Sequence, residues 1–231
     1  MKNQLLFLGL LFYTFFSNLY SQNSGTSLDQ DSNSFEWIKY GDQYWSVVNA
    51  EVETYRDGTP IPYIEDQTVW KDLTIGAWCY YENDSTDGKI FGKLYNWYAV
   101  DDARGLCPSG WHVPTDGEWM SLEMNLGLSD VEANNTGWRG TDQGSQLKTD
   151  FGWYNGGNGL NTSGFSGLPG GIRGSNGSFF VAGSYGYWWS SSPQGTFAWF
   201  RNLYTSNANV YRNSNFNRRG GFSVRCVLDA E

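Results

Sequence analysis

The sequence predicts an α+β fold in which antiparallel strands surround one or two helices and a long glycine-rich loop region. Runs rich in aromatic and β-branched residues, which are typical of strands, lie near both ends of the 231-residue chain. One well-marked helix start lies between them. Thirteen of the 29 glycines fall within residues 152–195, a density that favours loops over long regular elements. Strands grouped at the two ends with helices between them favour an antiparallel sheet.

Residues 1–21 have the three-part form of a secretory signal peptide. Lys2 gives a positive start, Leu5–Phe16 is largely apolar, and residues 17–21 can carry a cleavage site. The apolar run is shorter than the roughly 20 residues that a spanning helix needs, so we expect cleavage rather than a membrane anchor. No later segment is apolar enough to span a bilayer. We therefore expect a secreted or cell-surface protein, with the periplasm as an alternative.

The mature chain divides into a short lead-in and one domain. Residues 22–34 are almost entirely polar and predict a disordered lead-in. Residues 35–229 form the predicted domain. The whole chain has 24 acidic residues against 15 basic ones, a net charge of -9. An acidic surface repels phosphate backbones and anionic lipids, so nucleic acid is excluded as a general partner.

The first half of the domain contains two strand candidates, an ambiguous run and the clearest helix. Strands are expected at 43–48 and 77–81, and residues 94–100 fit either a strand or a short helix. Thr115 followed by Glu118 is a capping box, which predicts a helix that ends at Gly127.

The second half contains short helices and further strands. A second helix is expected at 129–134 or around 145–148. Strands are expected at 179–182, 197–203, 209–213 and 221–228. No repeat of fixed period is visible, which excludes a solenoid or a propeller.

Three cysteines, Cys79, Cys107 and Cys226, allow three pairings and leave one sulfur over. An oxidising compartment favours one disulfide. We favour Cys107–Cys226, because it would tie the segment before the main helix to the last strand. Closing such a long loop contributes about 4–5 kcal/mol in the chain-entropy model. The alternative is three buried thiols.

Several ordered motifs resemble the Fibrobacter succinogenes major paralogous domain, an extracellular bacterial module. The most specific are Gly92–Val100, Gly105–Trp119, Gly164–Arg173 and Ser223–Val227. The resemblance covers nearly the whole mature chain and implies a C-type-lectin-like fold. Within the second motif, Pro114–Trp119 is also distantly similar to the helix start of formylglycine-generating-enzyme-like domains. Neither similarity implies a settled activity for this chain.

Catalytic chemistry finds little support in the residues. His112 is the only histidine. We expect its imidazole to lie at the edge of the core with a hydrogen bond to the backbone, rather than to belong to a catalytic triad or a zinc site. Asp101 and Asp102 are explained better by a turn or an ion pair with Arg104 than as glycosidase carboxylates. A formylglycine-type oxidation needs two reactive cysteines near the end of the fold, and only Cys226 lies there. We therefore predict that the protein is not an enzyme.

No cofactor or metal site is predicted. Asn83–Gly88 faintly resembles the start of a calcium loop, but Leu94 stands where an acidic ligand is expected. The strand Trp189–Ser192 lacks the Trp-Asn-Asp pattern of calcium-dependent lectins. A structural calcium ion bound elsewhere in the chain is kept as an alternative.

Aromatic residues in or beside the glycine-rich region are the candidate ligand-binding residues. Exposed rings could stack on sugars. The alternative, which we favour, is that these rings are buried and hold the glycine-rich loop against the fold, because the loop has few aliphatic residues to do so. The candidates are Trp153, Tyr154, Tyr185, Tyr187 and Trp188.

These observations lead to one hypothesis and two rivals. We expect an exported, non-enzymatic module that binds a glycan, a polymer or a partner protein. The first rival is a structural subunit of a surface assembly without a small ligand. The second is an enzyme on the formylglycine-generating-enzyme-like scaffold, which a low-pKa Cys79 or a deep pocket at His112 would favour.

Overall fold

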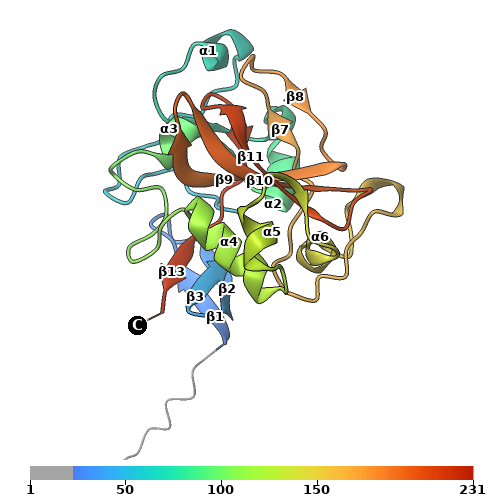
Figure 1. Ribbon diagram of the computed structural model, residues 1–231. Coiled ribbons are helices and arrows are strands. Elements are labelled where there is room, and N and C mark those ends of the chain that lie inside the picture. The colour runs from blue at the N-terminus through green and yellow to red at the C-terminus, as the bar shows by residue number, and fades with distance from the viewer. Residues whose placement is uncertain (1–22, 231) are drawn as a thin grey trace, which may run out of the picture.

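The computed structural model describes residues 23–230, and the predicted signal peptide at 1–21 lies outside this range. Three sheets with antiparallel strand pairs and several short helices form a mixed architecture, which confirms the predicted α+β class. In Figure 1 the first sheet lies at the end of the molecule from which the C-terminus emerges, and helix α1 lies at the opposite end. No helix in residues 23–230 is long and apolar enough to cross a bilayer.

The first sheet corrects the prediction of a disordered lead-in at 22–34. Its strand order is β1 (Ser24–Leu28), β2 (Ser34–Tyr40), β3 (Gln43–Ser46) and β13 (Val227–Asp229). Strand β1 pairs with β2 along its whole length. The polar residues after it fix the turn and join it to the domain: Asp29 accepts two backbone N–H bonds, and Gln30 donates to Thr54 and Leu106. Polarity here marks specific hydrogen bonds rather than disorder.

The second sheet has the order β6 (Gly137–Arg139), β11 (Val210–Asn217), β10 (Phe197–Tyr204) and β9 (Tyr185–Gln194). The predicted strands at 197–203 and 209–213 are confirmed. Strand β9 lies in the region 152–195, where only short strands between loops were expected, yet it is ten residues long. Its pairing with the whole of β10 overrides this weak local preference.

Helices α4 (Asp116–Asn125), α5 (Asp130–Asn134) and α6 (Gln143–Leu147) follow one another in the chain, and α4 and α5 lie beside the second sheet in Figure 1. The capping box is confirmed: Thr115 accepts from the Glu118 backbone, and the Glu118 carboxylate accepts from the Thr115 backbone. Both proposed positions for a second helix are helical. The cap fixes where α4 begins, and the Asp116 backbone N–H then donates to Ser192 Oγ of β9.

The third sheet consists of very short strands. Its order is β4 (Trp78–Cys79), β5 (Leu94–Asn96), β12 (Gly221–Phe222), β7 (Ile172–Arg173) and β8 (Phe179–Phe180). Short helices connect these strands: α1 (Gln67–Lys71), the 3-10 turn η1 (Tyr81–Asn83), α2 (Ser85–Phe91), α3 (Trp97–Val100) and the 3-10 turn η2 (Tyr154–Gly156). The ambiguous run 94–100 is both strand and helix, because the Asn96 side chain caps α3 directly after β5.

The predicted strand at 221–228 is divided between two sheets. Strand β12 belongs to the third sheet and β13 to the first, while residues 223–226 bond to other segments. Ser223 donates to Tyr187 O, and the Cys226 backbone donates to Ser46 Oγ. The predicted disulfide Cys107–Cys226 is confirmed, with the two Cα atoms 5.8 Å apart. It joins the segment before α4 to the start of the last strand.

A buried charge network joins α4 to the second sheet. The Glu123 carboxylate accepts from Arg139 (2.8 Å for both terminal nitrogens) and from Arg201 Nε (2.7 Å). Asp116 accepts from Arg201 and from Arg212. All five side chains are buried or nearly so. Each arginine therefore has a carboxylate partner, as charges removed from water require.

Candidate functional site

The second sheet presents two chemically different faces, because successive side chains of a strand point to opposite sides. One row of paired residues, Trp188, Arg201 and Arg212, faces α4 and is buried. The next row runs across all four strands and consists of Tyr187, Asn202, Tyr211 and Trp138. We call the side that carries this second row the aromatic face. Trp138 is 39% exposed, and Tyr187 and Tyr211 are half-buried.

A second, shorter row extends the aromatic face. Tyr185 pairs with Tyr204 across strands β9 and β10, and their rings stack with centroids 4.3 Å apart. Tyr185 also stacks on Tyr187, with the ring centroids 5.7 Å apart. Trp138 lies between Tyr211 (5.1 Å) and Tyr204 (6.3 Å). The rings therefore form a continuous run of aromatic contacts from β6 to β9.

An open hollow of about 330 Å³ lies on this face. Asn202 sits in it among the rings and is only 5% exposed, yet its Oδ1 has no hydrogen-bond partner. A buried acceptor without a partner costs about 1–3 kcal/mol, so such groups are uncommon in folded proteins. Asn213 beside it is satisfied, since it donates to Tyr211 Oη at 2.9 Å. The Asn202 oxygen thus lacks a hydrogen-bond partner and is itself covered from solvent, while the amide lies within hydrogen-bonding reach of the Tyr187 hydroxyl.

The hollow is also uncharged. Its lining residues are aromatic or amide side chains, with no acid or base among them: Trp138, Tyr185, Tyr187, Phe200, Asn202, Tyr211, Asn215 and Phe216. Burial raises the pKa of Tyr187 to about 12, and the neighbouring Tyr185 adds to that shift. Burial, followed by the adjacent Tyr204, raises the pKa of Tyr185. These phenols therefore stay neutral and serve as hydrogen-bonding groups across the physiological pH range.

The structure separates the five predicted binding residues. Tyr185 and Tyr187 lie on the aromatic face. Trp188 is on the opposite face of the same strand, 1% exposed, and donates to Asn49. Trp153 is also buried and donates to Thr149, so both tryptophans pack inside the fold, as the favoured alternative expected, and neither presents an exposed ring. Tyr154 is 60% exposed but lies outside the hollow.

Sequence reasoning missed four residues of the aromatic face: Trp138, Asn202, Tyr204 and Tyr211. They lie outside the glycine-rich region in which the candidates were sought. Tyr185 and Tyr187 are two residues apart, which places both on one face of a strand, but only the pairing of the strands brings Trp138, Asn202, Tyr204 and Tyr211 beside them.

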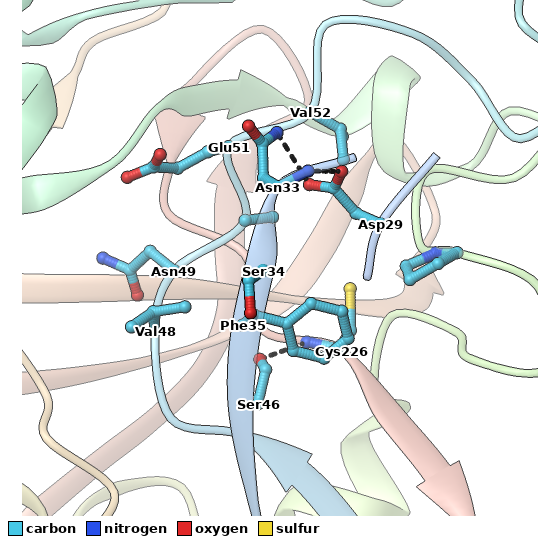
Figure 2. A pocket seen from close by; sticks show the side chains of 12 residues that line it. Asp29, Asn33, Ser34, Phe35, Ser46, Val48, Asn49, Glu51, Val52 and Cys226 are labelled. Carbon is cyan, nitrogen blue, oxygen red and sulfur yellow. Dashed lines mark hydrogen bonds between the residues drawn. The ribbon is translucent and has the colours of Figure 1, made fainter. Parts of the chain in front are cut away.

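A second cavity lies beside the disulfide, where the Phe35 ring and the Cys226 sulfur approach each other next to β2 (Figure 2). Apolar groups such as Val48 and Val52 dominate its lining. Its volume is about 50 Å³. Ligand pockets commonly have about 300–1,000 Å³, so this cavity is a small packing void.

The only histidine is engaged in structure. His112 Nε2 lies 2.6 Å from Glu118 Oε1, in the carboxylate that closes the capping box of α4. This hydrogen bond raises the pKa of His112. Asp229 lies close by, so these three side chains offer ligand atoms within 4.8 Å of one another. Gln43 donates to both carboxylates, and thereby holds β3, α4 and β13 together.

The other groups considered for chemistry also have structural partners. Cys79 is buried, and desolvation raises its pKa to about 12, which leaves a weakly nucleophilic thiol. Asp102 forms an ion pair with Arg104 at 2.7 Å, as expected. In the faint calcium-loop resemblance at 83–88, Asp84 caps helix α2 by accepting from Thr86.

Comparison with known proteins supports the family resemblance. The family model described as the Fibrobacter succinogenes major domain matches residues 38–228, well over half of the chain. The searches of curated proteins and of solved structures found no match to this chain.

Proposed function

Since this chain belongs to the Fibrobacter succinogenes major domain family, we propose that it is an exported, non-catalytic module that binds a glycan on its aromatic face. A C-type-lectin-like architecture is part of this proposal. The mixed α+β fold, its short strands and the disulfide between the segment before α4 and the last strand support it. The disulfide also supports an oxidising compartment outside the cytosol.

The observation that carries the proposal is Asn202, a buried amide whose oxygen lacks a partner at the centre of a row of aromatic rings. A sugar ring has apolar C–H faces and hydroxyl edges. Its faces can pack on Trp138 and the tyrosines, and one hydroxyl can donate to Asn202 Oδ1. A ligand of this kind uses both features of the face at once.

We propose that the module is not catalytic because the potentially reactive side chains, His112 and Cys79, are both engaged in or buried by the fold. His112 is held by the carboxylate of a helix cap, and Cys79 is buried with a raised pKa. Neither group faces the hollow on the second sheet. An enzyme on this scaffold would need a nucleophile or an acid–base pair in its binding site.

The test is binding of the mature domain to a polysaccharide panel by affinity electrophoresis and glycan array. We expect retention on at least one polysaccharide, and Trp138→Ala and Tyr204→Ala should abolish it. Phe197→Ala is the matched control, since Phe197 is an exposed ring at the other end of β10, outside the hollow. Binding that survives both substitutions on the aromatic face would refute the site. Concentration-dependent oligomers without glycan binding would favour the surface-assembly rival.

A further inference from the structure

The aromatic face is neutral in a chain whose net charge is -9. The cations of the second sheet are on the other side: Arg139, Arg201 and Arg212 point at Asp116 and Glu123. A ligand carboxylate or sulfate on the aromatic face would lose water without gaining a cationic partner. Burying an unpaired ion is costly, and the net negative charge of the chain adds repulsion.

The polar groups on the face are suited to hydroxyls. Asn202 Oδ1 can only accept, so its missing partner is a donor. The Tyr211 hydroxyl accepts from Asn213, and its own proton can be donated to an ether or hydroxyl oxygen. These groups lie between apolar rings, which matches the alternation of C–H faces and hydroxyls in a sugar.

The row from Trp138 to Tyr187 crosses four strands. Three inter-strand spacings of about 4.8 Å give a platform about 14 Å long. This length exceeds a single sugar ring and matches a short run of a chain. The hollow is open rather than enclosed, so part of a longer chain can lie in it.

We propose that the aromatic face binds an uncharged polysaccharide chain, which lies across the four strands while a sugar hydroxyl donates to Asn202 Oδ1. This inference rests on the proposed glycan-binding function and adds the ligand's charge class, its direction and the group that recognises it. Anionic polysaccharides are discriminated against, because the face has no cation to pair with them.

The test compares polymers with the same backbone. The mature domain is run in affinity electrophoresis against hydroxyethyl cellulose and carboxymethyl cellulose, and against neutral and carboxylated forms of xylan and mannan. We expect retention by a neutral member and at least about tenfold weaker retention by its carboxylated form. Binding to the neutral polymer should change little between low and high salt, since no ion pair is involved.

Two substitutions examine the recognition directly. Asn202→Ala should weaken neutral binding about three- to tenfold, the loss of one hydrogen bond. Asn215→Lys adds a cation at the exposed edge of the hollow and should improve binding of the carboxylated polymer while the neutral polymer stays bound. Thermal unfolding of each variant checks that the fold is kept, and Asn215→Lys is informative even where Asn202→Ala unfolds.

The outcomes separate the two proposals. If the carboxylated polymer binds more tightly than the neutral one, and Trp138→Ala abolishes that binding, the inference that the face prefers uncharged chains is overturned, while glycan binding on this face still stands. Failure of all polysaccharides to bind would overturn both. A protein partner lost in Trp138→Ala, with no polysaccharide bound, would also overturn both and show the face to be a protein interface.

Discussion

Replacing Glu123 with glutamine should destabilise the domain strongly. The carboxylate is fully buried on α4 and accepts three short hydrogen bonds, two from Arg139 and one from Arg201. Glutamine keeps the volume but removes the charge, and it directs an NH₂ group at a guanidinium. Removing one member of a buried ion pair costs about 3–5 kcal/mol.

Urea denaturation of the oxidised domain, followed by tryptophan fluorescence, measures this loss. In thermal unfolding of a domain of this size, each kcal/mol of lost stability lowers Tm by about 2–4 °C, so we expect the Tm of Glu123→Gln to fall by roughly 6–20 °C. Glu132→Gln on the exposed side of α5 is the control and should change stability by less than about 0.5 kcal/mol.

A loss below about 1 kcal/mol for Glu123→Gln would refute this reasoning. It would mean that water or a neighbouring group compensates the two arginines. The stabilising effect belongs to the complete network, since buried ion pairs can often be replaced together by apolar residues of similar volume. The triple variant Glu123→Leu, Arg139→Met, Arg201→Met should therefore be more stable than Glu123→Gln alone.

Three further predictions concern the cysteines and the histidine. Removing the Cys107–Cys226 bridge by a double serine substitution should lower the free energy of unfolding by about 4–5 kcal/mol in a denaturant titration, because the bridge closes a loop of 119 residues. A loss below about 2 kcal/mol would contradict the loop-closure argument. Cys79 should resist iodoacetamide at pH 8 in the folded protein and react fully in 6 M guanidinium, as mass spectrometry would show; fast labelling of the native protein would contradict its buried, high-pKa state. The hydrogen bond to Glu118 raises the pKa of His112 in the folded protein. The ion pair between the two side chains therefore stabilises the fold fully at pH values below about 6.5, the pKa of histidine in the unfolded chain, and this stabilisation is lost as the pH rises through the pKa of the folded state. The stability difference between wild type and His112→Gln should accordingly shrink from pH 6 to pH 9, and a difference that grows would reverse the assigned sign.

The features predicted well from the sequence are those determined by neighbouring residues. Thr115 and Glu118 form their capping box within one turn of helix, so the start of α4 follows from local chemistry. The strands β10 and β11 are rich enough in aromatic residues to be recognised alone. The disulfide followed from only three cysteines and the expected compartment.

The features that were missed depend on contacts between distant segments. Strand β1 has no apolar pattern, and it is ordered because it pairs with β2 and because Gln30, in the turn after it, donates to Thr54. Tyr187 and Trp188 are adjacent, yet one faces the hollow and the other the core. Only the pairing of β9 with β10 decides which side each occupies, and no local signal contains that information.

The pairing of β3 with β13 has a consequence for biogenesis. Residues 43–45 hydrogen-bond with residues 227–229, so the first sheet joins segments from opposite ends of the domain. A chain with such non-local pairing folds slowly and late, since the last strand must be present before the sheet can close. On the proposed export route, this sheet would be completed only after translocation, and oxidation of Cys107 and Cys226 would then lock it.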